Sequence, residues 1–296
     1  TTASDATSND NDGTIYGATW STDVPPVDPP PTLDGMEQLT VQFWANLAEY
    51  SLDESKGINF VIKTEHPSDY ISYSFYTAGD ENRLTFRVRT TSGAAGANLS
   101  NYSDYVSLNE WYLFTGVYNG ANIQLYIDGV LMVEDDLTGT VIQNDYPVSL
   151  ANITNPSTTK NYYGKMDDLS IWNTALTQEQ IQSHMSTELN GNETGLIGYW
   201  NFNEGTGTTA TDATTNNNNG TIYGASWSID VPNVDSTNYS LSFDGVDDYV
   251  EIADSDEPVD PPPPVIPTIV INEFLASNDA CCTDENGEYE DYIEVY

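Results

Sequence analysis

Residues 110–129 read EWYLFTGVYNGANIQLYIDG, and this stretch decides the fold class. Two runs rich in apolar and aromatic residues, 111–118 and 123–127, are separated by Asn119-Gly120. Asp128-Gly129 then separates the second run from a third at 130–133. Asn-Gly and Asp-Gly are the strongest short signals of a β-hairpin, because both central residues of its turn need positive φ. The stretch therefore predicts consecutive antiparallel strands joined by tight turns.

Upstream of this stretch, apolar residues alternate with polar ones at the period of two that a half-buried strand requires. The alternation predicts strands at 39–47, 58–62, 71–75 and 83–89. Many short antiparallel strands with tight turns are typical of a β-sandwich or jelly roll. We therefore predict an all-β antiparallel sandwich.

One short helix is expected, at residues 177–185. Thr177 is a favourable N-cap and Gln180 follows three positions later, which is the pattern of a capping box. Leu176, just before the cap, is placed to pack on Ile181 as a hydrophobic staple. The helix would cover one edge of the sandwich.

The composition is strongly acidic, with 46 Asp and Glu against 7 Lys and Arg and a formal net charge of −39. Such a surface repels nucleic acid and anionic lipid headgroups. No stretch approaches the roughly 18 apolar residues of a membrane span. We therefore expect neither nucleic-acid binding nor membrane insertion. The two cysteines, Cys281 and Cys282, are adjacent, which is neither a disulfide framework nor a zinc pattern.

The chain contains a long-range repeat, since residues 1–25 and 208–232 are identical at 19 of 25 positions. A spacing of 207 residues indicates whole modules in tandem, because solenoid repeats are only about 20–50 residues long. Two proline-rich stretches act as extended linkers. We predict five segments: the tail of a preceding module (1–25), a linker (26–32), the sandwich with a C-terminal extension (33–257), a linker (258–267) and the start of another domain (268–296).

Several motifs in order resemble the laminin G-like, concanavalin A-like jelly rolls. The family's hairpin core matches 110–118 and 123–129, and its last core strand and following helix match 163–173 and 174–181. The resemblance implies a concanavalin A-like antiparallel β-sandwich with one helix, secreted or on the cell surface. In this family a strand like 242–252 should precede Leu39, so we predict that residues 239–252 supply that strand from downstream.

The C-terminal stretches 269–278 and 284–296 resemble the opening of a lamin-tail domain. That resemblance implies a partial immunoglobulin-like segment and, again, a secreted protein.

Calcium is the cofactor that the laminin G-like resemblance implies. Hard carboxylate oxygens on loops suit it, and the candidates are Asp167, Asp168, Asp244, Asp247 and Asp248. The alternative is structural, since Asp244-Gly245 is also an ordinary turn and Asp167 and Asp168 would alternate faces on a strand.

Catalysis is not expected. Glycoside hydrolysis needs two carboxylates across the scissile bond, and the Glu-x-Asp-x-x-Glu run of laminarinase-like enzymes with this fold is absent from the sequence. His66 and His184 have no serine or cysteine motif near them.

Ligand binding has two groups of candidates. Tyrosines in predicted loops can stack on sugars: Tyr102, Tyr105, Tyr162 and Tyr163. Three arginines on one strand face can bind a carboxylated or sulfated glycan, each through two parallel hydrogen bonds: Arg83, Arg87 and Arg89. The alternative for the arginines is cross-strand pairing with the abundant acids. Four tryptophans lie in the family's framework motifs, and core packing is expected for most of them: Trp44, Trp111, Trp172 and Trp200.

Together these features favour a non-catalytic extracellular binding or adhesion module that recognises a polysaccharide or cell-surface glycan or protein with the help of calcium. The alternatives are a structural spacer in a large secreted protein and an accessory module of a glycoside hydrolase. An exposed aromatic cluster on one face would favour binding, and a uniformly acidic surface would favour the spacer.

Overall fold

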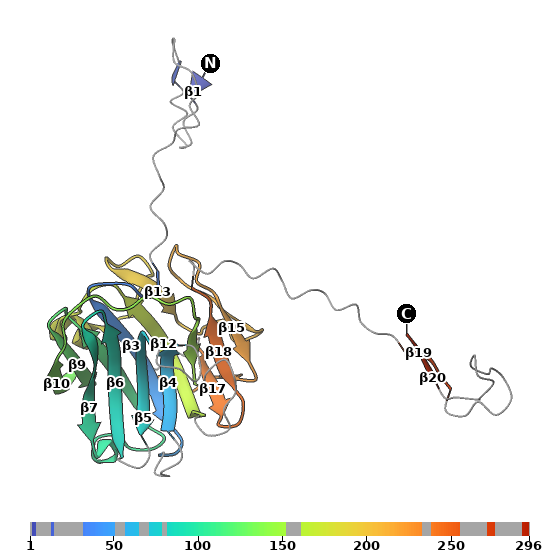
Figure 1. Cartoon of the computed structure of the whole chain (residues 1–296), viewed down its shortest axis with the longest axis horizontal. Coiled ribbons are helices and arrows are strands. Elements are labelled where there is room, and N and C mark those ends of the chain that lie inside the picture. Colours follow the sequence, from blue (N-terminus) through green and yellow to red (C-terminus); the bar gives the residue numbers. More distant parts are fainter. Residues whose placement is uncertain are drawn as a thin grey trace.

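In the described part of the chain, two antiparallel sheets of eight strands each face one another (Figure 1). The computed structural model describes residues 32–50, 57–64, 71–78, 82–151, 161–232 and 238–254, and the backbone of four short strands at 2–3, 13–14, 271–275 and 292–295. The all-β sandwich predicted from the alternating sequence is confirmed.

The first sheet, called the β12 sheet, runs in the order β10 (Val130–Asp136), β9 (Asn122–Ile127), β8 (Trp111–Tyr118), β3 (Leu39–Leu47), β12 (Tyr163–Trp172), β17 (Ser240–Asp244) and β16 (Ser226–Ser228), with β13 (Leu196–Trp200) also paired to β12. The second, called the β6 sheet, runs in the order β14 (Thr209–Ala210), β15 (Gly220–Tyr223), β18 (Tyr249–Ile252), β11 (Val148–Leu150), β4 (Gly57–Lys63), β5 (Tyr73–Ala78), β6 (Arg83–Thr90) and β7 (Gly93–Ser100). Figure 1 looks onto the β6 sheet, with β3 and β12 behind it.

Phenylalanines fill the space between the two sheets. Phe43, Phe60, Phe75 and Phe114 lie with ring centroids 5.1–6.3 Å apart, and each is at most 1% exposed. Such tilted and edge-on pairs add to the free energy gained by burying the rings. The interior is therefore one continuous apolar layer to which both sheets contribute.

A second apolar cluster covers the outer face of the β12 sheet, beneath α1 (Gln178–His184). Trp44 and Trp172 belong to it, and Trp200 belongs to the interior core. All three are at most 7% exposed, so the expectation that these tryptophans pack in cores is confirmed.

The helix begins as the sequence predicts. Thr177 Oγ1 accepts a hydrogen bond from Gln180 N at 3.3 Å, and Gln180 Oε1 accepts one from Thr177 N at 2.8 Å. Leu176 and Ile181 are both buried in the outer cluster, as a hydrophobic staple requires. The capping box is confirmed, and the helix packs on the outer face of the β12 sheet through Leu176 and Ile181.

The downstream strands complete both sheets. β17 pairs with β12, and β18 lies between β15 and β11. Residues 239–252 therefore enter the sandwich from downstream, as predicted. Two short pairs stand outside the sandwich sheets: β1 (Thr2–Ala3) with β2 (Gly13–Thr14), and β19 (Ile271–Leu275) with β20 (Tyr292–Val295). Cys281 and Cys282 lie outside the described residues.

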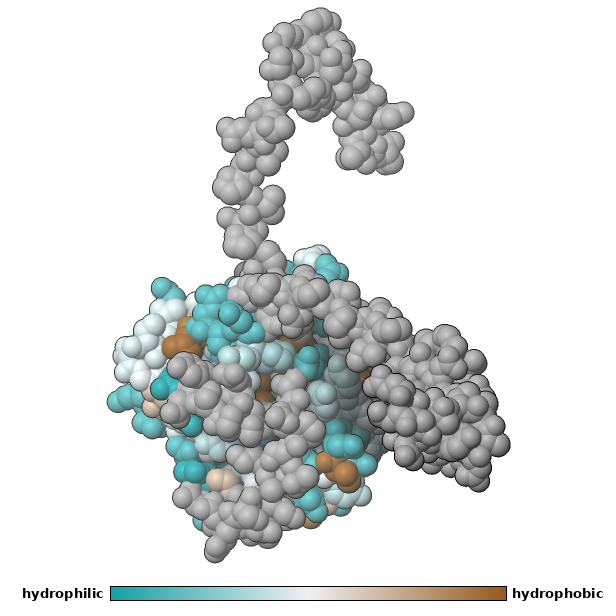
Figure 2. All heavy atoms as spheres, turned by 45° about the vertical axis from the view of Figure 1, so that its right-hand side comes forward, coloured by the Kyte–Doolittle hydropathy of each residue, from teal (hydrophilic) through white to brown (hydrophobic). Residues whose placement is uncertain are grey.

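The described surface is mostly hydrophilic in Figure 2, with scattered hydrophobic side chains. Among the described residues, no helix is long and apolar enough to cross a membrane.

Candidate binding sites

A β-bulge in β12 brings Asp168 to the outer face of the β12 sheet, beside Asp167. β12 pairs with β3 up to Asp167 opposite Trp44 and resumes at Ser170 opposite Gln42, which leaves one extra residue on β12. Asp168 takes the left-handed conformation, with φ of +50°. A bulge of this kind re-aims a side chain, and both aspartates line the same pocket. The expectation that they alternate faces is wrong.

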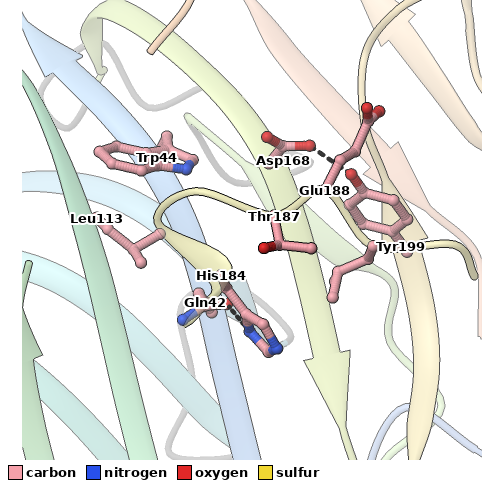
Figure 3. Close-up of a pocket in the computed structure, with 9 residues that line it drawn as sticks. Gln42, Trp44, Leu113, Asp168, His184, Thr187, Glu188 and Tyr199 are labelled. Atoms are coloured by element: carbon pink, nitrogen blue, oxygen red, sulfur yellow. Dashed lines mark hydrogen bonds between the residues drawn. The ribbon is translucent and has the colours of Figure 1, made fainter. Parts of the chain in front are cut away.

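The bulge borders a cavity of about 320 Å³, called here the acidic pocket. Its walls are Asp167, Asp168, Met185, Ser186, Glu188, Val231, Pro232 and Asn238. A smaller hollow of about 20 Å³ adjoins it and shares Asp168 and Glu188 (Figure 3). The two hollows lie between the outer face of the β12 sheet and the segment that follows α1.

Burial controls the charges in the acidic pocket. It raises the pKa of the Asp167 carboxyl well above its usual value, and the neighbouring charge of Asp168 raises that pKa further. Burial also raises the pKa of Asp168 to about 6, against the lowering effect of a hydrogen bond that Tyr199 Oη donates to Asp168 Oδ1 at 2.5 Å. Figure 3 shows Asp168 and Tyr199 turned toward each other, with Glu188 beside them.

His184 lines the smaller hollow and is held in place on two sides. Its Nδ1 lies 2.9 Å from Gln42 Oε1, and its ring stacks on Trp172 at a centroid distance of 5.5 Å. Burial lowers the pKa of His184, so the ring is neutral at neutral pH. A neutral ring adds no positive charge beside the carboxylates.

The three arginines lie on the outer face of the β6 sheet, on the opposite side of the sandwich. They alternate along β6 with buried Leu84, Phe86 and Val88, so they share one face as predicted: Arg83, Arg87 and Arg89. Their direct cross-strand neighbours are small or polar, including Ser74 and Gly96 beside Arg87 and Ala94 beside Arg89. Within the described residues, neither Arg87 nor Arg89 forms an ion pair with an acid.

A stacked tyrosine pair lies on the same outer face, toward the other edge of the β6 sheet. Tyr223 of β15 and Tyr249 of β18 are direct cross-strand neighbours, with centroids 4.4 Å apart and ring planes 14° apart. Tyr223 is 41% exposed. No local sequence pattern predicts this pair, because its members are far apart in the sequence and become neighbours only through strand pairing.

Of the four predicted tyrosine platforms, two are buried. Tyr102 and Tyr162 are each 1% exposed and belong to the interior core, so they cannot stack on a ligand, and that prediction is wrong. Tyr162 Oη lies within 2.8 Å of the carbonyl oxygens of Asn46 and Lys165, which explains how a loop tyrosine is held inside. Tyr105 and Tyr163 remain exposed, at 51% and 45%.

The predicted set of five calcium ligands divides into two places. Asp244 ends β17, Asp247 and Asp248 follow it, and the three bring carboxylate oxygens within 4.8 Å of one another; among the described residues this is the one such trio. Asp167 and Asp168 do not join them and border the acidic pocket instead.

The Asp244–Asp248 turn is also held by its own carboxylates. Asp248 Oδ2 accepts a hydrogen bond from Asp244 N at 2.7 Å, and Asp244 Oδ1 accepts one from Val246 N at 2.8 Å. Asp244 and Asp247 are exposed and Asp248 is buried, which raises the pKa of Asp248. The exposed Tyr163 lies beside this turn, since a Cβ on Gly245 would stand 3.0 Å from Tyr163 Cβ.

A laminin G family model, described as the concanavalin A-like lectin/glucanases superfamily, matches residues 22–182, more than half of the chain. A comparison with curated proteins gives no match.

Solved structures with a similar fold include a protein from Bacteroides ovatus described as carbohydrate-binding, with 12% identity, 74% of this chain and 54% of that chain covered, and a TM-score of 0.47. A SAP-like pentraxin from Limulus polyphemus is 15% identical, with 52% of this chain and 71% of the pentraxin chain covered and a TM-score of 0.39. Domains LG4-5 of the mouse laminin alpha1 chain are 12% identical, with 51% of this chain and 40% of the laminin chain covered and a TM-score of 0.38. The chain thus spans about half the length of the Bacteroides protein.

Proposed function

Because the chain belongs to the laminin G-like family of the concanavalin A-like lectin/glucanases superfamily, we propose that it is a non-catalytic module that binds an extracellular glycan. The site is the outer face of the β6 sheet. The ligand class is a polysaccharide that carries carboxylate or sulfate groups. The module acts outside the cell, where such polymers are found.

The arginine row is the observation that carries this proposal. The chain has only 7 basic residues against 46 acidic ones, yet three of the seven share one strand face. Arg87 and Arg89 form no ion pair with any described acid, so their guanidinium groups are available to a ligand. Guanidinium forks bind carboxylate and sulfate groups bidentately. The overall negative charge opposes this binding only weakly, because physiological salt screens charges beyond roughly 8 Å.

The tyrosine pair extends the site across the sheet. From β15, which carries Tyr223, to β6, which carries Arg87, there are five strand-to-strand steps. At ~4.8 Å for each step the two features are about 24 Å apart. That length suits an extended chain of several sugar units, with an exposed aromatic ring for a sugar face at one end and guanidinium groups for acidic substituents at the other. An aromatic and cationic face is also not what a bare spacer requires.

The experiment is affinity electrophoresis through gels that contain a sulfated, a carboxylated or a neutral polysaccharide. We expect retardation by at least one anionic polymer and at least a tenfold weaker affinity, about 1.4 kcal/mol, in the double variant Arg87→Ala, Arg89→Ala. The matched control is Lys165→Ala, which removes a cation from the β12 sheet. Equal retardation of the arginine variant and the wild type would overturn the proposed site.

We also propose a calcium site at the turn that contains Asp244, Asp247 and Asp248. Three convergent carboxylates supply the hard oxygen ligands that calcium takes, with the remaining positions open to water or sugar hydroxyls. The exposed Tyr163 beside the turn supports sugar contact there. Isothermal calorimetry with calcium chloride tests this: Asp247→Asn should abolish the heat of binding, and Asp135→Asn on β10 should not. Heat that is unchanged in Asp247→Asn would contradict the site.

A further inference from the structure

The hairpin formed by β1 and β2 has the same register as a hairpin inside the sandwich. Thr2 of β1 pairs with Thr14 of β2. Thr209 of β14 pairs with Thr221 of β15 in the equivalent way. The offset between the two pairs is 207 residues, which is the offset of the sequence repeat. The two copies of the repeat therefore form the same hairpin.

The two copies differ only at positions that the sandwich leaves exposed. Six positions differ between residues 1–25 and 208–232, and all six residues of the second copy are exposed: Thr211, Thr215, Asn217, Asn219, Ser226 and Ile229. Every residue that is buried in the second copy is identical in the first: Ala210, Asp212, Thr214, Asn218, Gly220 and Ile222. Residues 1–25 therefore contain every residue that the sandwich buries at this place.

Hydrogen bonds that join the hairpin to β13 use the same conserved residues. Asp212 Oδ1 accepts the N–H of Tyr199 at 3.1 Å. The carbonyl oxygen of Asn218 accepts a hydrogen bond from Trp200 Nε1 at 2.8 Å. Residues 1–25 have an aspartate and an asparagine at the equivalent positions. The first copy can therefore make the same contacts with β13.

β18 and β17 are the strands that receive the hairpin, because β15 pairs with β18 and β16 pairs with β17. Both strands follow the second copy of the repeat in the chain. No such strands follow the first copy: residues 26–31 include four prolines, which cannot donate to a strand ladder, and the described backbone of 32–38 contains no strand. Within the described part of the chain, β17 and β18 are thus the strands that fit both copies.

We propose that residues 1–25 of one copy of this chain take the place of residues 208–232 in the sandwich of a second copy. The identical buried residues make the two docked hairpins similar in free energy. The extent of exchange therefore depends on protein concentration and on how often residues 208–232 open. Residues 26–32 connect the donor hairpin to its own sandwich, and a connection this short and rich in proline favours exchange between copies over folding back.

This inference does not rest on the proposed glycan site. The exchange depends on the buried residues of the hairpin, and glycan binding depends on the arginine row of β6. Loss of exchange in a hairpin variant and loss of glycan binding in the arginine variant are separate results.

The test is disulfide trapping between two variants of the full chain, both of which also carry Cys281→Ser and Cys282→Ser. The donor carries Thr14→Cys and the acceptor carries Glu251→Cys. The counterpart of Thr14 in the sandwich is Thr221, which is the direct cross-strand neighbour of Glu251 and close enough for a disulfide. The mixture is partly unfolded in urea, returned to buffer and oxidised, and mixed dimers are identified by mass spectrometry.

We expect a disulfide-linked dimer of donor and acceptor. Ile15→Asp in the donor should lower its yield by about tenfold or more, because the counterpart Ile222 is 4% exposed and a buried unpaired charge is unfavourable. The matched control in the donor is Thr22→Asp. It adds the same charge, but its counterpart Ile229 is 81% exposed, so the yield should not change.

Ile222→Asp in the acceptor should raise the yield severalfold, because the acceptor's own hairpin then competes poorly. Absence of the mixed dimer with the unaltered acceptor hairpin would overturn the proposal. An equal yield with an acceptor that carries Asp135→Cys on β10 would also overturn it, since the disulfide would then report random collision. If one chain carrying both Thr14→Cys and Glu251→Cys gave only an internal disulfide, the hairpin would fold back, and exchange with a second copy would be contradicted.

Discussion

Lys63 Nζ lies 2.6 Å from Asp254 Oδ2 and 3.5 Å from Asp34 Oδ2, and the three side chains are fully buried. Asp34 stands where the chain enters the sandwich, and Asp254 where it leaves. Asp254 Oδ1 also accepts the N–H of Leu33 at 3.2 Å. One ammonium of β4 therefore joins the two ends of the folded module.

We predict that Lys63→Met destabilises the module by about 3–5 kcal/mol, because two buried carboxylates lose their cation. Urea denaturation measures the change in the free energy of unfolding. The control is Lys165→Met, whose partner Asp230 is 51% exposed and whose loss should cost about 1 kcal/mol or less. Equal losses of unfolding free energy in the two variants would show that the buried ion pairs of Lys63 contribute no more than the exposed ion pair of Lys165.

The stability of the module should fall as the pH rises through 6. Burial raises the pKa of Asp34 from 3.8 to about 6, against the lowering effect of Lys63. The folded state thus binds a proton more tightly than the unfolded state, so this contribution is full below pH 3.8 and lost above about 6. Burial also raises the pKa of Asp168, so its contribution to the stability of the module is likewise lost as the pH rises.

Thermal unfolding of the wild type and of Asp34→Asn at pH 5 and pH 8 measures this effect. We expect the wild type to be more stable at pH 5, and the substitution to reduce the difference by about 1–3 kcal/mol. A wild type that gained stability between pH 5 and pH 8 would contradict the raised pKa.

Gly116 of β8 is required by close packing against the opposite sheet. A Cβ at this position would stand 2.3 Å from the Phe86 ring. We expect Gly116→Ala to cost about 1–3 kcal/mol through overpacking. Phe86→Leu in the same chain should recover part of that loss, which a double-mutant cycle by chemical denaturation would detect. Purely additive losses would show that the two residues do not interact.

Removal of residues 239–252 should abolish cooperative unfolding of the sandwich. Without β17, residues 163–166 of β12 lose their partner strand on one side, and without β18, β15 is separated from β11. Differential scanning calorimetry of the shortened chain measures the transition. A melting temperature equal to that of the whole chain would mean that these strands are not part of the folded unit.

Sequence patterns predicted the elements whose burial depends on local alternation. β3 has the predicted bounds, and the capping box at Thr177 forms as expected. β7 was missed because its sequence, GAAGANLS, carries little apolar alternation; it forms by pairing along the whole of β6.

The sites were harder to predict, because they depend on register and burial. Asp167 and Asp168 meet only because a bulge forms opposite Trp44 and Gln42, and no local signal fixes where pairing slips. Glu188 and Tyr199 come to Asp168 from other segments, one from the stretch after α1 and one from β13. Tyr162 was misplaced because a loop position in the sequence does not reveal a side chain that turns into the core.

A glycan-array screen of the full chain, in calcium and again with chelator, is the decisive test of glycan binding. We expect binding to carboxylated or sulfated polysaccharides that is weaker in the double variant Arg87→Ala, Arg89→Ala and reduced when calcium is removed. Absence of binding to every anionic glycan under both conditions would contradict the claim that the outer face of the β6 sheet is a glycan site.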